Sequence, residues 1–245
     1  MLNADGGSSV VLVCEHASRF IPPSFDNLGL SAEGARSHAA WDPGALAVAQ
    51  ALSERLDASL VAGTVSRLIY DCNRPPDSVD AMPDRSELID VPANRQLRDS
   101  DRAARVRTYY LPFRAAVAER LAAIDTPVLI TIHSFTPVYH GKRRSVEIGV
   151  LHDVDARLAD ALLHVAARHI GADVRRNQPY GPEDGVTHTL KEHAVPGGHL
   201  NAMLEIRSDL IETPAQQVAM ADTLAASIAE AFDRTGAEGV VRCMA

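Results

Sequence analysis

The sequence predicts an α/β fold of three layers, in which helices cover both faces of a central mixed, mainly parallel sheet. Short apolar runs rich in β-branched residues recur along the chain and are typical of buried strands. Longer segments with apolar residues at helical spacing alternate with these runs, which favours a largely parallel sheet. We expect residues 1–245 to form a single domain, because α/β domains often reach about 200–250 residues.

The expected elements alternate along the chain. Strands are predicted at 10–14, 59–65, 128–132, 145–151 and 202–206. Helices are predicted at 43–56, 102–123, 154–170 and 214–232. Asp42 is suited to cap the first helix, because Pro43 favours the first helical position. Two polar segments rich in Pro or Gly, 75–100 and 175–200, are predicted as long ordered loops, which usually serve function.

Composition excludes several classes of protein. The 24 basic and 32 acidic residues give a net charge of −8, which argues against a protein that binds the nucleic-acid backbone. The longest apolar runs, Val10–Cys14 and Pro127–Ile130, fall far short of the roughly 20 residues that cross a bilayer. The first ten residues lack the pattern of a signal peptide, and the three cysteines form no CxxC pair. We therefore expect a cytoplasmic protein with no membrane or nucleic-acid partner.

Polar side chains follow the predicted strands at the point where each strand ends. His16 comes just after the first strand, His133 follows the strand at 128–132, and Glu205 lies near the end of the strand at 202–206. Arg67 and Arg74 follow the strand at 59–65. Sites in α/β sheets form at the carboxyl edge of the strands, so we expect these side chains to lie together.

Two histidines and a carboxylate form the kind of ligand set that binds a catalytic zinc ion or another divalent metal, with one position left for water. His16 and His133 are the predicted histidine ligands, and Asp42 is the predicted carboxylate ligand, with a plain helix cap as its alternative role. A separate carboxylate must take a proton from the water, and Glu205 fits that task. Arg67 could face the developing oxyanion, and Arg74 could bind a substrate carboxylate.

Seven stretches of the chain, taken in order, resemble the N-formylglutamate amidohydrolase family. They are CEHASRFIPPSFDNLGL, HAAWDPGALA, SRLIYDCNRPPD, TIHSFTPV, IGVLHD, NQPYGP and LEIRSDL, and they extend from about residue 10 to 230. The resemblance implies hydrolysis of an N-formyl or other N-acyl amino acid, giving formate and a free amino acid such as glutamate. It also implies a fold similar to the zinc carboxypeptidases and aspartoacylases.

The resemblance implies roles for further residues. Asn73 and Arg74 match the Asn-Arg pair that binds substrate in those enzymes, and Ser134, Arg144 and Tyr180 are expected in the substrate pocket. The carboxypeptidase-like pattern His-x-x-Glu is absent, because Arg19 stands third after His16. Three residues therefore remain candidates for completing the metal shell: Asp42, Glu15 and His38. Asp42 is favoured over Glu15, because neighbouring residues of a strand face opposite ways.

Departures from the family leave the substrate open. In the well-known members that take part in histidine degradation, the corresponding first motif resembles PHSG, whereas this chain has CEHAS. The resemblance therefore indicates the class of reaction better than the exact substrate. A carboxypeptidase-like peptidase on short peptides and a binding module of the same fold are the alternatives. A serine hydrolase is disfavoured because no GxSxG motif is present. The expected partner is a small N-acyl amino acid, and a homo-oligomer is left open.

Overall fold

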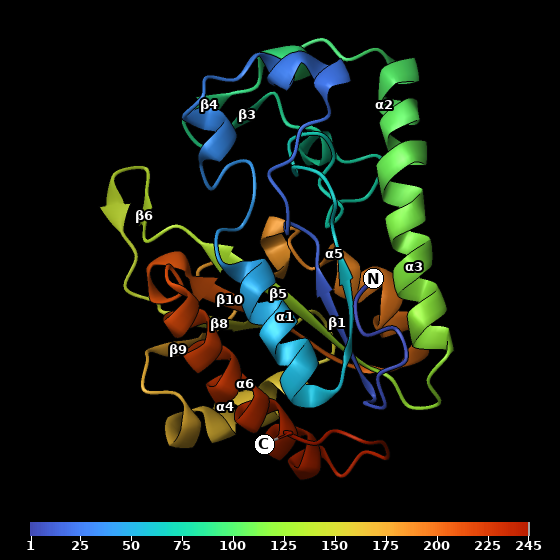
Figure 1. The fold of residues 1–245 in the computed structure, drawn as a ribbon, viewed down its shortest axis with the longest axis vertical. Coiled ribbons are helices and arrows are strands. Elements are labelled where there is room, and N and C mark those ends of the chain that lie inside the picture. Colours follow the sequence, from blue (N-terminus) through green and yellow to red (C-terminus); the bar gives the residue numbers. More distant parts are fainter. Residues whose placement is uncertain (245) are drawn as a thin grey trace.

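A six-stranded mixed sheet forms the centre of the protein, which a computed structural model describes for residues 1–244 (Figure 1). Its strand order is β2-β1-β5-β10-β8-β9. The bounds in that order are Ser59–Ala62, Val10–Cys14, Val128–Phe135, Leu200–Arg207, Ile148–Leu151 and Val174–Arg176. All neighbours are parallel except β8 and β10, which are antiparallel. The expected mixed, mainly parallel sheet is confirmed.

Helices cover both faces of this sheet and complete three layers. One face packs against α1 (Ala45–Leu56), α4 (Arg157–His169) and α6 (Pro214–Thr235), which bury a stripe of Leu, Val and Ala side chains. The other face packs against α3 (Leu111–Ala122) and α5 (His188–His193). Within residues 1–244 no helix combines the length and the apolar character needed to cross a membrane.

The alternation of side chains along β1, β5 and β10 determines which residues lie on the sheet face that α3 and α5 cover. Val13 of β1, Leu129 of β5 and Met203 of β10 all pack into the core on this face. Because strand side chains alternate with a period of two, His133 and Glu205 lie on the same face, further along β5 and β10. Both side chains lie beyond the apolar core, at the carboxyl ends of their strands.

The long polar segments are not simple loops, which corrects the prediction. Segment 75–100 contains a hairpin of β3 (Arg85–Ser86) and β4 (Ile89–Asp90), flanked by 3₁₀ turns at Val79–Ala81 and Pro92–Asn94. Segment 175–200 contains most of β9, the helix α5 and 3₁₀ turns at Pro182–Asp184 and Val195–Gly197. A further hairpin joins β6 (Val138–Tyr139) to β7 (Lys142–Arg143). Elements this short leave little periodicity in a sequence.

Several boundaries also differ from the prediction. The helix expected at 102–123 starts as α2 (Asp99–Arg105) and continues through a π-helical turn at Val106–Tyr110 into α3. The strand expected at 145–151 is only β8, and further 3₁₀ turns occur at Pro23–Gly29, Gly34–Arg36 and Ser208–Leu210. The first helix begins at Ala45 with Gly44 as its N-cap, in a left-handed conformation (φ 82°). Asp42 therefore does not cap α1, and its carboxylate is available to the site.

Candidate functional site

Five distant segments bring charged side chains together at the carboxyl edge of the sheet. His16 follows β1, Asp42 precedes α1, and Asp71 lies in the segment after β2. His133 and Glu205 come from β5 and β10, where they are partners in the parallel ladder. The backbone N–H of Asp42 donates to the carbonyl of His16 over 3.0 Å, which returns the chain before α1 to the end of β1.

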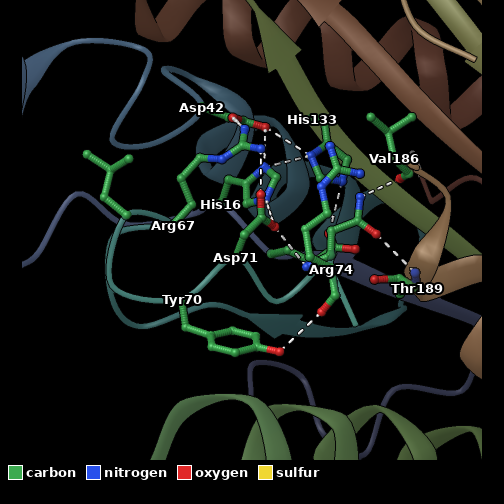
Figure 2. Close-up of polar contacts among 12 residues, drawn as sticks. His16, Asp42, Arg67, Tyr70, Asp71, Arg74, His133, Val186 and Thr189 are labelled. Atoms are coloured by element: carbon green, nitrogen blue, oxygen red, sulfur yellow. Dashed lines mark hydrogen bonds and ion pairs between the residues drawn. The ribbon is translucent and has the colours of Figure 1, made fainter. Parts of the chain in front are cut away.

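His16, Asp42 and His133 form a tight, buried cluster (Figure 2). One carboxylate oxygen of Asp42, Oδ2, lies 3.2 Å from Nδ1 of His16 and 2.9 Å from Nδ1 of His133. The two Nδ1 atoms are 3.2 Å apart. The sequence therefore selected two histidines and a carboxylate that the fold brings into contact.

Each of the two imidazoles is contacted on its far side by one further carboxylate. Oδ1 of Asp71 lies 2.7 Å from Nε2 of His16, and Oε2 of Glu15 lies 3.0 Å from Nε2 of His133. The second pair has the spacing of an ion pair, but its angle does not satisfy a hydrogen bond. Carboxylates in this position fix the tautomer and orientation of metal-binding histidines. Nδ1 of both rings is thereby directed toward Asp42.

The sequence analysis missed this role for Asp71 and Glu15. Strand alternation disfavours Glu15 as a partner of His16 in the metal shell, and Glu15 is not part of the His16–Asp42–His133 group. Glu15 continues the row of Val13 and reaches His133 on the neighbouring strand. A signal for Asp71 was the chain segment it shares with Asn73 and Arg74, but only the fold shows that it reaches His16.

The charges in the cluster stabilise one another. Burial and Arg67 act to lower the pKa of His16, but Asp71 and Asp42 outweigh them and raise it. Burial likewise opposes the charge on His133, yet Glu15 and Asp42 hold its pKa well above the ordinary value. Burial acts to raise the pKa of Asp42, and the two imidazoles reverse that effect and lower it.

The donor set fits a divalent metal ion. Two imidazole nitrogens and a carboxylate oxygen can meet within 4.8 Å of one another, and each residue is buried. Two nitrogens and an oxygen with room for a fourth ligand are typical of catalytic zinc. His38, the remaining histidine candidate, is not part of this group, because its Nε2 contacts Oε2 of Glu87 at 2.7 Å.

Glu205 lies beside this cluster on the wall of the cleft. Its side chain is buried, and burial raises its pKa to about 7. No hydrogen bond or ion pair of Glu205 with another side chain occurs among residues 1–244. Arg207 lies two positions further along β10, but its guanidinium contacts Asp209 at 2.7 Å and Glu147 at 3.2 Å rather than Glu205.

Two arginines line the same cleft, and they differ in how their guanidinium groups are bonded. Arg67 donates through Nη2 to Asp71 over 2.6 Å, and its Nη1 lies 3.5 Å from Oδ1 of Asp42. Arg74 has a buried Nη1 without a hydrogen-bond partner among residues 1–244. A buried guanidinium N–H left unpaired is costly, so this atom is available to an anion.

Asn73 lies next to Arg74 but directs its amide elsewhere. Its Nδ2 donates to the carbonyl of Val186, and its Oδ1 accepts from the backbone N–H of Thr189 over 3.0 Å (Figure 2). Tyr70 supports the same segment, because its hydroxyl donates to the carbonyl of Arg74 over 3.3 Å. The contacts of Asn73 thus fix the segment that carries Arg74 against the start of α5.

The three other expected pocket residues take different positions. Ser134 donates its hydroxyl to the carbonyl of Pro43 over 2.8 Å and its N–H to Oδ2 of Asp42 over 3.3 Å. Tyr180 lines the cleft, and burial raises its pKa to about 12. Arg144 lies behind the wall, with its guanidinium 4.5 Å from the ring centre of Tyr139 and 4.7 Å from that of Tyr180.

The cleft has a volume of about 350 Å³. A second set of residues, from the two hairpins and the segment before α1, forms its outer part: His38, Arg85, Ser86, Glu87, Thr136 and Tyr139. The inner part carries the histidine cluster, Glu205 and both arginines. In such a cleft a carboxylate can accept a proton from water while cationic groups stabilise a carbonyl oxygen. The chain is a hydrolase that acts on amide bonds.

Sequence comparison gives the particular family. A model of the N-formylglutamate amidohydrolase family matches residues 8–212, and the chain belongs to this family. The resemblance seen in the sequence is thereby confirmed. A search of curated proteins gives no match.

Two solved structures are similar to the chain. The gene product Atu2144 from Agrobacterium tumefaciens is 53% identical, with a TM-score of 0.93 over 96% of this chain and 94% of that chain. The N-formylglutamate amidohydrolase from Ralstonia eutropha JMP134 is 17% identical, with a TM-score of 0.57 over 95% of this chain and 96% of that chain. At that identity the second likeness is one of fold.

Proposed function

We propose that this protein is a metal-dependent amidohydrolase that removes the formyl or another small acyl group from an N-acyl amino acid. One observation carries the proposal. The His16–Asp42–His133 cluster lies in one cleft with Glu205 and with Nη1 of Arg74, neither of which has a hydrogen-bonding partner among the described residues 1–244. The family supports the amide-bond chemistry, and the donor set supports the metal.

His16, Asp42 and His133 would hold the ion, and zinc suits them best. When bound there, a divalent ion supplies Lewis acidity that favours ionisation of water and polarises a carbonyl. Glu205 accepts the proton of the attacking water and passes it to the leaving nitrogen. Its pKa of about 7 suits a group that must both accept and donate a proton near neutral pH.

The two arginines have separate tasks in this proposal. Arg67 is bonded to Asp71 through Nη2, and its side chain is 29% exposed, so N–H groups remain to face a carbonyl oxygen that gains negative charge. Arg74 binds the carboxylate of the amino acid, which supplies the partner its buried Nη1 lacks. Tyr180, neutral at physiological pH, adds a hydroxyl to the cleft wall.

A direct test combines metal analysis with a substrate panel. The purified protein is assayed for bound metal and for release of formate or the acyl acid from N-formyl-L-glutamate, N-acetyl-L-glutamate and N-formyl-L-leucine. A short peptide with a free carboxyl end is the comparison substrate. We expect metal-dependent turnover of the N-acyl amino acids. Preferential cleavage of the peptide would instead assign the carboxypeptidase-like activity.

A further inference from the structure

Three separate segments of the outer cleft wall meet at the carboxylate of Glu87. Its Oε2 contacts Nε2 of His38 at 2.7 Å, and its Oε1 accepts the backbone N–H of His140 over 2.8 Å. Glu87 belongs to the β3–β4 hairpin, His38 to the segment before α1, and His140 to the β6–β7 hairpin. Both hairpins lie in the upper left of Figure 1, outside the central sheet. We call this three-residue contact the Glu87 clasp.

The local backbone prepares both hairpins for this contact. Glu87 and His140 each adopt a left-handed conformation at a hairpin tip, with φ of 51° and 46°. Arg85 donates through Nε to the carbonyl of Glu87 over 3.0 Å, which fixes the first tip. The Glu87 side chain is only 10% exposed, whereas its neighbour Leu88 is 63% exposed. The carboxylate is therefore directed inward, between the segments it joins.

The bonds of the clasp favour a charged carboxylate. Burial acts to raise the pKa of Glu87, but the N–H of His140 and the imidazole of His38 outweigh it and lower the pKa. The groups that face Glu87 are the imidazoles of His38 and His140 and the guanidinium of Arg85 on its own hairpin. A carboxylate that accepts two hydrogen bonds in a largely buried position holds its neighbours more firmly than a neutral acceptor would.

The joined segments also bound the cleft. His38, Arg85, Ser86, Glu87, Thr136 and Tyr139 line it, and they come from the same three segments. His38 lies four positions before Asp42, and Thr136 lies three positions after His133, so the clasp joins direct continuations of two segments that carry proposed metal ligands. While the clasp is closed, the cleft of about 350 Å³ has a fixed outer wall.

We propose that Glu87 is a positioning residue for specificity, and that the Glu87 clasp limits the substrate to a single amino acid with a short acyl group. The inference rests on the proposed amidohydrolase function. Peptides and long-chain acyl groups are excluded because the part of such a substrate that extends beyond one amino acid and a short acyl group would have to displace the two hairpins. Opening of the clasp lengthens the cleft without altering the metal-binding cluster, since none of its three residues belongs to that cluster.

Hydrogen–deuterium exchange tests the clasp without any substrate. Glu87→Ala removes both contacts, whereas Glu87→Gln keeps an oxygen that can accept the N–H of His140. Asp90→Ala is the matched control, because Asp90 lies on the same hairpin and, among residues 1–244, its carboxylate forms ion pairs with Arg85 and Arg95 alone, at the surface. We expect faster exchange in residues 136–143 for Glu87→Ala, with Glu87→Gln intermediate and Asp90→Ala like the parent. Unchanged exchange in Glu87→Ala would overturn the clasp, whatever the activity of the enzyme.

Substrate discrimination tests the consequence. The ratio of kcat/KM is measured for N-formyl-L-glutamate against N-hexanoyl-L-glutamate and against the dipeptide derivative N-formyl-L-glutamyl-L-alanine. We expect Glu87→Ala to shift at least one ratio toward the longer compound by about tenfold, the scale of a single methylene contact. Ratios like those of the parent, in a variant whose hairpins exchange faster, would overturn the role in specificity. Failure of every variant and the parent to act on the formyl amino acid would count against the proposed function alone.

Discussion

Glu205 and His133 are direct partners in the parallel ladder between β10 and β5, and their side chains share one face of the sheet. This register places a carboxylate beside the histidine cluster without making it a member. In the proposed function, a residue in that position acts on a water molecule at the cluster, while remaining free to move a proton. The role of Glu205 therefore depends on the register between β5 and β10.

Glu205→Gln should abolish most of the turnover and leave the fold intact. Glutamine keeps the shape of the side chain but cannot accept the proton, so we expect kcat to fall by roughly two to four orders of magnitude. Metal content and melting temperature, measured on the same sample, should match the parent. Full metal loading with near-normal kcat would contradict the assignment of Glu205 as the base.

Arg74→Ala should weaken substrate binding without harming stability. Loss of a desolvated partner for the substrate carboxylate should weaken the binding free energy by about 2–4 kcal/mol. We expect kcat/KM to fall accordingly, mainly through a higher KM. The variant also removes a buried N–H that has no partner within residues 1–244, so its melting temperature should stay level or rise. Arg74→Lys keeps the positive charge but loses the two parallel N–H donors of the guanidinium. Its kcat/KM should therefore lie between those of the parent and Arg74→Ala. An unchanged kcat/KM in Arg74→Ala would exclude the role.

Asp71→Asn should reduce metal affinity, although Asp71 is not a proposed ligand. Its Oδ1 lies 2.7 Å from Nε2 of His16, and loss of such a carboxylate typically costs about 10–100-fold in affinity. Competition with a fluorescent zinc indicator measures the change. Asp222→Asn is the matched control, because Asp222 also accepts from an arginine, Arg55, at 2.7 Å but contacts no histidine. Equal affinity in the two variants would show that Asp71 does not orient His16.

His193 should make the fold sensitive to mild acid. Burial lowers its pKa to about 4, whereas the unfolded chain has an ordinary histidine pKa of about 6.5. Between these values the unfolded state binds the extra proton, so the stability that is complete above about pH 6.5 is lost as the pH falls toward 4. We expect a loss on the order of 1 kcal/mol per pH unit in this window.

Urea unfolding at pH 7 and pH 5 measures this loss. His193→Gln should flatten the difference between the two pH values relative to the parent. His164→Gln, at an exposed position of α4, should leave the difference unchanged. Parallel pH dependence of the parent and His193→Gln would show that His193 does not contribute.

The sequence predicted the sheet and the central cluster because both depend on strong local signals. The buried strands β5 and β10 are apolar along most of their length, and His133 and Glu205 interrupt that pattern near the strand ends. A charged residue in such a position is visible without a structure. Asp42 was also found, although the expected cap was wrong, since Gly44 occupies that position.

Contacts between distant, irregular segments could not be predicted in the same way. Glu87 lies in a polar stretch without periodicity, and only the fold brings it to His38 and His140. The same holds for Glu15, whose side chain reaches His133 on the neighbouring strand. The π-helical turn at 106–110 left no signal either, because its residues fit an ordinary helix pattern.

The dispersal of the site over five segments has a consequence for the nascent chain on the ribosome. When residues 1–135 have emerged, β1 can pair with β2 and β5, but the other edge of β5 has no partner until β10 is made. That edge is apolar and unpaired in the meantime, which is the condition that favours association between incomplete chains. Glu205, the proposed catalytic carboxylate, arrives with the same strand that covers this edge, so the proposed site is completed at the step that removes the unpaired edge.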